Sequence, residues 1–72
     1  MNPSMNPRLW EARRAKDLSQ QELAELVGVT RKDIGLIESE GWIPPLEVRV
    51  GLAKVLKVPV DTLFPLGGDR AS

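Results

Sequence analysis

Arg31 and Lys32 stand side by side directly after Thr30, at the start of a segment whose apolar residues recur with helical spacing. An arginine can donate two hydrogen bonds to O6 and N7 of one guanine, or pair with a phosphate. Because positive charges at a helix N-terminus oppose the helix dipole, this placement calls for a compensating ligand. Arg31 and Lys32 are therefore candidates for a contact with a nucleobase edge or a phosphate. The alternative is a pair of solvated charges on an exposed turn.

Two short helices joined by a tight turn must position these two basic side chains. Ser19 with Glu22 forms a capping box that starts one helix, and Thr30 with Asp33 starts the next. Gly28 falls where the first helix must end in a left-handed residue. The apolar residues that would lock the two helices together are Leu23, Val27, Val29, Ile34 and Ile37. A second helix held steeply by a short glycine turn is the unit that enters a DNA major groove.

The remaining sequence predicts three further helices. Helices are expected over 7–16, 20–27, 31–39, 46–56 and 60–64, with Asn6 as the first N-cap. The helix over 46–56 is apolar on most sides, so it should be central or share a face with a partner. Within it, Arg49 needs a carboxylate partner or a route to water. Gly51 costs about 1 kcal/mol of stability relative to Ala, unless a neighbour packs closely there. The expected domain covers 7–65, between flexible segments at 1–6 and 66–72.

Length and composition narrow the function classes. A chain of 72 residues is one domain at most, with no room for a separate small-molecule ligand domain. The absence of Cys and His excludes disulfides, thiol nucleophiles, Cys/His zinc sites and histidine catalysis. The acidic residues are scattered, so no metal or other cofactor is expected. No apolar run approaches the roughly 20 residues that cross a bilayer. We expect a cytoplasmic protein that contacts no membrane and is not an enzyme.

The charge balance weighs against strong non-specific DNA binding. The formal net charge is zero, whereas many small DNA-binding proteins are basic. Between Arg8 and Lys32, six basic residues stand against four acidic ones, so the charge distribution favours DNA more than the total does.

The stretch from Leu9 to Phe64 resembles the Cro/lambda-repressor-like helix-turn-helix family, also called the xenobiotic-response-element type. The strongest matches are Leu18-Ser19-Gln20, Glu22-Leu23-Ala24, Gly28-Val29-Thr30, Ile34 and Ile37-Glu38. The resemblance implies an all-α fold: a compact five-helix bundle whose second and third helices form the helix-turn-helix. It also implies binding to double-stranded operator DNA, usually as a homodimer.

The resemblance also assigns candidate DNA contacts. The expected base-reading residues are Arg31, Lys32, Gly35 and Leu36. The expected phosphate contacts are Gln20, Ser19, Thr30 and Trp42. Leu36 could instead pack under the following loop, and Gln20 could be an ordinary exposed residue at a helix start. Ser19 fits a capping role better than a ligand role. Trp42 lies where relatives often have basic residues. Packing at the edge of the core is favoured over a hydrogen bond from its indole N–H to a phosphate.

Two further sets of residues carry structural expectations. Arg13 and Glu38 match a family pair that fixes the third helix against the first; the alternative is two solvated charges. The expected dimer interface comprises Val60, Leu63, Phe64 and Leu66, which leave more apolar surface than a one-turn helix can bury alone. Pro45 and Pro59 replace the usual Ser or Thr caps of the last two helices.

Two functions remain open at this point. The first is a sequence-specific transcriptional regulator, a repressor that binds a near-palindromic operator as a homodimer. The second is an antitoxin or another protein-interaction module on the same fold. The zero net charge, the apolar Trp42–Ile43 loop and the apolar tail near Phe64 favour this second function.

Overall fold

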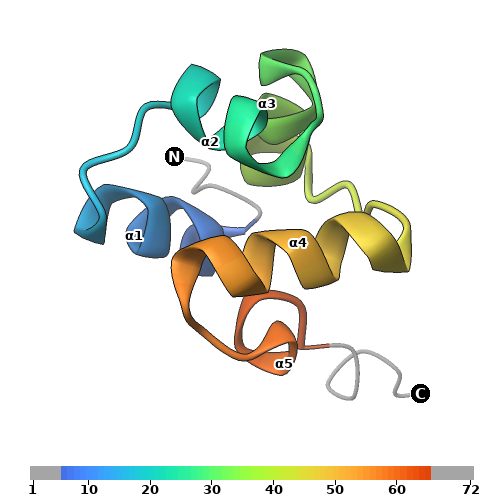
Figure 1. Ribbon diagram of the computed structural model, residues 1–72. Coiled ribbons are helices and arrows are strands. Elements are labelled where there is room, and N and C mark those ends of the chain that lie inside the picture. The colour runs from blue at the N-terminus through green and yellow to red at the C-terminus, as the bar shows by residue number, and fades with distance from the viewer. Residues whose placement is uncertain (1–5, 66–72) are drawn as a thin grey trace.

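Five helices make up the part of the chain that the computed structural model describes, residues 6–65 (Figure 1). They are α1 (Pro7–Ala15), α2 (Gln20–Val27), α3 (Arg31–Glu40), α4 (Leu46–Leu56) and α5 (Val60–Leu63). In Figure 1, α4 crosses the middle of the molecule, with α3 above it and α5 below it. It packs against α2 and α5, whereas α1 packs against α3 and α5. Residues 6–65 contain no strand, and the expected all-α fold is confirmed.

Local capping explains why the helices begin where they do. The Asn6 side chain accepts a hydrogen bond from the Leu9 N–H at 3.0 Å, and both expected capping boxes are present. Gly28 ends α2 with φ +90°, and Gly41 ends α3 with φ +76°. α4 and α5 follow Pro45 and Pro59 and have no side-chain cap. Every helix therefore lies within one residue of its predicted bounds at either end.

Asn6 belongs to the packed unit, although the expected flexible segment included it. Its amide nitrogen donates to the Leu63 carbonyl at 3.0 Å, which ties the start of α1 to α5. The side chain is 9% exposed. The rest of that segment and the expected tail at 66–72 lie outside the described residues, so the domain bounds stay a prediction.

All five helices contribute side chains to one core. Its buried apolar residues are Leu9, Leu23, Ala24, Ile34, Ile37, Leu52, Ala53, Leu56, Leu63 and Phe64. α4 crosses this core, and its Gly51 lies against α2. A Cβ built on Gly51 would approach Val27 Cγ1 to 3.3 Å, so a neighbour does pack closely at this glycine. Arg49 donates from Nε to the Pro44 carbonyl at 2.9 Å, where a carboxylate or water was expected.

Lys57, at the end of α4, offers a direct stability test. Its φ is +60°, in the left-handed region that favours glycine. We expect Lys57→Gly to raise the free energy of unfolding by about 1 kcal/mol, measured by denaturant titration. The matched control is Lys54→Gly, which removes the same side chain inside α4 and should lower stability by about 1 kcal/mol. A loss of stability in both variants would contradict the cap assignment.

Candidate nucleic-acid interface

α2 and α3 are joined by a turn that the backbone itself fixes. The N–H groups of Gly28 and Val29 both donate to the Ala24 carbonyl, at 2.8 and 2.9 Å. Val29 packs against the core, and Thr30 then caps α3. Because the joint is short and hydrogen-bonded, the angle between the two helices is set by the fold and not by a mobile loop.

The four expected base-reading residues gather on one surface of α3. Arg31 and Lys32 are exposed on its first turn, and Gly35 and Leu36 are half-buried one turn later. A surface pocket is lined by Gln20, Arg31, Lys32, Gly35, Leu36, Ser39 and Glu40. A Cβ added to Gly35 would meet nothing within 4 Å, so this part of the helix is open to an approaching molecule. Contact with bases at these positions stays a prediction.

A buried ion pair holds α3 against α1. Arg13 donates from Nε to Glu38 Oε2 at 2.7 Å and from Nη2 to Glu38 Oε1 at 3.2 Å. Its Nη1 donates to the Leu18 carbonyl at 2.8 Å, which also secures the approach to α2. Arg13 is 8% exposed and Glu38 is 3% exposed, so the alternative of two solvated charges is wrong. Through these bonds Arg13 links α1 to α3 and to the segment that precedes α2, and these three parts position the pocket.

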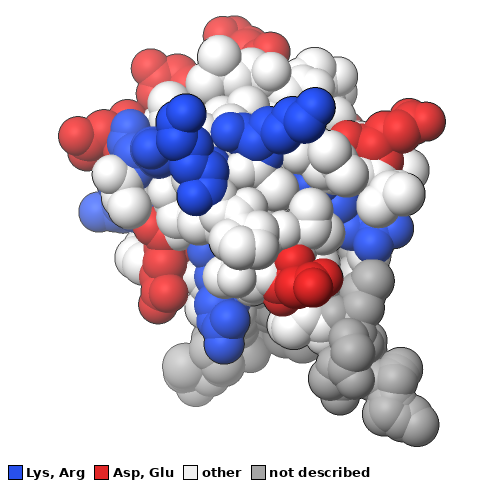
Figure 2. All heavy atoms as spheres, turned by 60° about the horizontal axis from the view of Figure 1, so that its bottom comes forward, with Lys and Arg blue, Asp and Glu red and all other residues white. Residues whose placement is uncertain are grey.

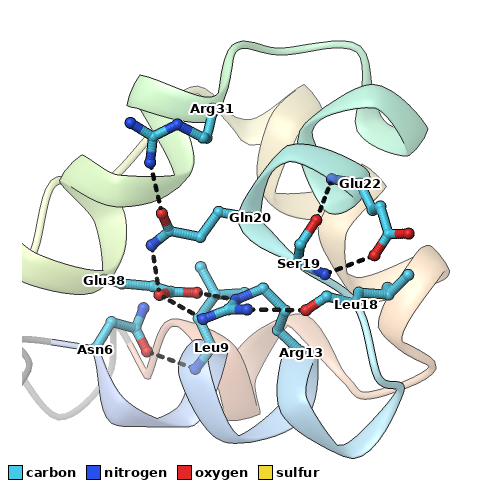
Figure 3. A network of polar contacts seen from close by, with 9 residues as sticks. All are labelled: Asn6, Leu9, Arg13, Leu18, Ser19, Gln20, Glu22, Arg31 and Glu38. Carbon is cyan, nitrogen blue, oxygen red and sulfur yellow. Dashed lines mark hydrogen bonds and ion pairs between the residues drawn. The ribbon is translucent and has the colours of Figure 1, made fainter.

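Gln20 does not present a free amide to the solvent. Its Nε2 donates to Glu38 Oε1 at 3.0 Å, and its Oε1 accepts from Arg31 Nη1 at 3.0 Å (Figure 3). The alternative of an ordinary exposed residue at a helix start is therefore wrong, because Glu38 and Arg31 supply an acceptor and a donor within reach. A phosphate contact by this side chain stays a prediction, and it would have to displace or share one of these bonds.

The hydroxyls of Ser19 and Thr30 act as helix caps. Ser19 Oγ accepts from the Glu22 N–H at 2.9 Å, and Thr30 Oγ1 accepts from the Asp33 N–H at 3.1 Å. Both residues are exposed, so each hydroxyl proton remains available to a phosphate oxygen. Their expected phosphate contacts stay predictions.

Exposed apolar side chains gather around the loop between α3 and α4. Trp42 is 40% exposed, Ile43 49% and Leu46 58%. Trp42 is thus not enclosed by the core. On α1, Trp10 is 42% exposed and carries the Arg14 guanidinium 5.0 Å above its ring centroid. This cation–π contact gives Trp10 a local partner that the sequence pattern did not indicate.

The expected dimer interface is wrong for two of its residues. Leu63 is 0% exposed and Phe64 is 3% exposed, because α5 folds back onto α1 and α4. Their apolar surface is therefore already buried within the chain. Val60 is half-buried, and Leu66 lies outside the described residues.

The charge distribution carries no dominant sign on the face drawn in Figure 2. Basic and acidic side chains are interspersed there, and much of the surface between them is uncharged. Among residues 6–65, no group of three or more acidic side chains could hold a metal ion. In the same part of the chain, no helix combines the length and apolarity needed to cross a membrane.

Three comparisons agree with this architecture. A family model described as helix-turn-helix matches residues 11–63. The transcriptional regulator YobD of Bacillus subtilis, itself uncharacterised, is 37% identical over 62 residues, which are 86% of this chain but only 55% of YobD. An uncharacterised regulator of the same type from Archaeoglobus fulgidus is 32% identical over 60 residues, covering 83% of this chain and 84% of that protein.

Among solved structures, the restriction-modification controller protein C.AhdI from Aeromonas hydrophila matches with a TM-score of 0.74 and 37% identity. The match covers 83% of this chain and 91% of C.AhdI. The resemblance drawn from the capping boxes and the glycine turn is thereby confirmed. The chain belongs to the xenobiotic-response-element type of the helix-turn-helix family of DNA-binding transcriptional regulators.

Proposed function

We propose that the protein is a sequence-specific repressor that binds a near-palindromic operator as a homodimer. The carrying observation is the exposed first turn of α3, where Arg31 and Lys32 share one pocket with Gly35 and Leu36. α3 of each subunit would enter successive major grooves, about 34–36 Å apart. Bound in this way, the dimer would block polymerase sterically. It would act in the cytoplasm, without a cofactor and without enzymatic activity.

The four expected base-reading residues in the pocket have separate roles in this proposal. Arg31 would grip a guanine with two hydrogen bonds, and Lys32 would contact a neighbouring base or phosphate. Gly35 would admit close approach of the backbone, since nothing lies within 4 Å of its missing Cβ. Leu36 would touch a thymine methyl group. Ser19, Thr30, Gln20 and Trp42 would contact phosphates and so fix the register without reading sequence.

Selection from randomised duplex DNA tests base reading. We expect the wild-type chain to enrich an inverted repeat, and Arg31→Ala or Lys32→Ala to change the preferred base at one position per half-site. Loss of one two-bond contact should reduce discrimination there by about 1–3 kcal/mol. The matched control is Lys16→Ala, which removes an exposed basic side chain outside the pocket and should leave the preferred DNA sequence unchanged. The proposal would be refuted if the wild type enriched no sequence, or if the enriched sequence stayed the same in both substituted proteins.

The homodimer requires its own test. A single α3 reads only a few base pairs, so two copies on a two-fold site would supply the needed specificity. We expect analytical ultracentrifugation to show a dimer at high micromolar concentration. A monomer at that concentration would refute dimerisation of the free protein.

A protein-interaction function is the second candidate. It is favoured by the exposure of Trp42, Ile43 and Leu46, at 40%, 49% and 58%, around one loop. An antitoxin would use such a surface to bind a small toxin encoded by a neighbouring gene. Co-expression with that gene product should yield a stable complex that Trp42→Ala weakens. Independent purification of the two proteins would count against this role.

A further inference from the structure

The outer side of α1 carries an exposed arginine that an aromatic ring holds in place. The guanidinium carbon of Arg14 lies 5.0 Å above the ring centroid of Trp10, and both side chains are exposed. We propose that Arg14, positioned by Trp10, binds a phosphate of the DNA backbone beside the start of α2. This inference rests on the proposed function, and it adds α1 to the surface that contacts DNA.

Helical geometry places this pair on the side of α1 that borders α2 and α3. Around the helix axis, Trp10 lies about 60° from Arg13 and about 160° from Arg8. Arg13 reaches α3 and the carbonyl that precedes α2, whereas Arg8 donates to α5 on the opposite side (Figure 3). Because the guanidinium of Arg14 is drawn over the Trp10 ring, it shares the side of α1 nearer the start of α2. Phosphate contacts are already proposed for that helix start.

The charge of Arg14 is available to a ligand. Among residues 6–65, no carboxylate forms an ion pair with Arg14, although Glu11 stands one turn before it on the same helix. The face of an aromatic ring attracts a guanidinium through its quadrupole, so most of the five N–H donors stay available. A guanidinium can bind a phosphate with two parallel hydrogen bonds. Its contact with Trp10 also reduces the side-chain freedom that binding would otherwise remove.

The chemistry of the pair favours a backbone phosphate over an apolar partner. An apolar surface laid over Trp10 would desolvate the Arg14 charge without supplying an acceptor, which is costly. A phosphate supplies acceptors for the guanidinium and for the exposed indole N–H. Since the net charge of the chain is zero, its affinity for DNA must depend on individual cations placed where phosphates lie.

The salt dependence of binding to duplex DNA tests the inference. The duplexes are the one enriched by selection and an unrelated sequence of the same length. We expect Arg14→Ala to weaken binding to both duplexes alike, by about fivefold. It should also reduce the slope of log K against log salt concentration by about 0.9. The matched control is Arg8→Ala, which removes the same charge from the opposite side of α1 and should retain the wild-type slope.

Substitution of Trp10 tests its positioning role. Trp10→Ala keeps the Arg14 charge but removes the ring that holds it, so we expect about a threefold loss of affinity for both duplexes. That loss should disappear in the Arg14→Ala background, because the ring then has no guanidinium to hold. Trp10→Phe keeps a ring face and should recover most of the wild-type affinity. Far-ultraviolet circular dichroism checks that each variant is folded.

The outcomes separate this inference from the proposed function. Wild-type affinity and slope in Arg14→Ala, a changed base preference, or an equal fall in slope with Arg8→Ala would overturn the phosphate contact and leave base reading by α3 intact. An equal loss from Trp10→Ala in both backgrounds would overturn the positioning role. A wild-type chain that binds both duplexes equally would overturn the sequence-specific function, and the salt slopes would still decide the phosphate contact.

Discussion

Glu38→Ala is expected to lower the free energy of unfolding by about 3–5 kcal/mol. The substitution removes the acceptor of both hydrogen bonds that Arg13 donates to Glu38, and leaves Arg13, which is 8% exposed, without its carboxylate partner. It also removes the acceptor of the Gln20 amide. Small domains have total stabilities of about 5–15 kcal/mol, so this variant should be marginally folded at 25 °C. Denaturant titration followed by far-ultraviolet circular dichroism measures the change.

The double substitution Arg13→Met with Glu38→Leu is the control for Glu38→Ala. Removing both charges together avoids the cost of an unpaired buried ion, and similar apolar volumes refill the site. We expect this variant to recover most of the lost stability. A double variant as unstable as Glu38→Ala would show that the site tolerates no apolar replacement, and a stable Glu38→Ala would show that the pair contributes little to folding.

Leu23→Ala is expected to lower the free energy of unfolding by about 2–5 kcal/mol. Leu23 is 0% exposed at the contact between α2 and the rest of the core, so truncation leaves a cavity there. The matched control is Leu26→Ala, which changes the same residue type in the same helix. Leu26 is 60% exposed, and the control should change stability by no more than about 0.5 kcal/mol.

Equal effects of these two leucine substitutions would contradict the orientation of α2. They would mean that Leu26 is covered in solution, for example by a second copy of the chain. Measurement at two protein concentrations separates that case, because a contact between copies makes the unfolding midpoint depend on concentration.

The helices were predictable from the sequence because their signals are local. Ser19 with Glu22 and Thr30 with Asp33 each satisfy the free N–H groups of a helix start within three residues. Gly28 ends α2 by a conformation that glycine adopts without strain. The four expected α3 residues line one pocket, which agrees with their helical spacing, but their selection came from the resemblance to the family.

Side-chain partners that depend on tertiary approach were not predictable in the same way. The resemblance assigned Gln20 a phosphate contact at the start of α2, but its amide turns toward Glu38, which lies 18 residues away in sequence. Leu63 and Phe64 appeared to exceed what a one-turn helix can bury, because the sequence does not show how α5 folds onto α1. Arg49 found a backbone carbonyl, an acceptor that every residue carries and no pattern distinguishes.

The most direct test of DNA reading by α3 is a titration of the ¹⁵N-labelled chain with the duplex enriched by selection, followed by backbone amide shifts. The assignment of α3 as the reading element predicts the largest changes over residues 30–36, with a second group at Ser19 and Gln20 at the start of α2. Saturating binding that leaves residues 30–36 unchanged, with shifts confined to Trp42–Leu46 or to α5, would contradict it.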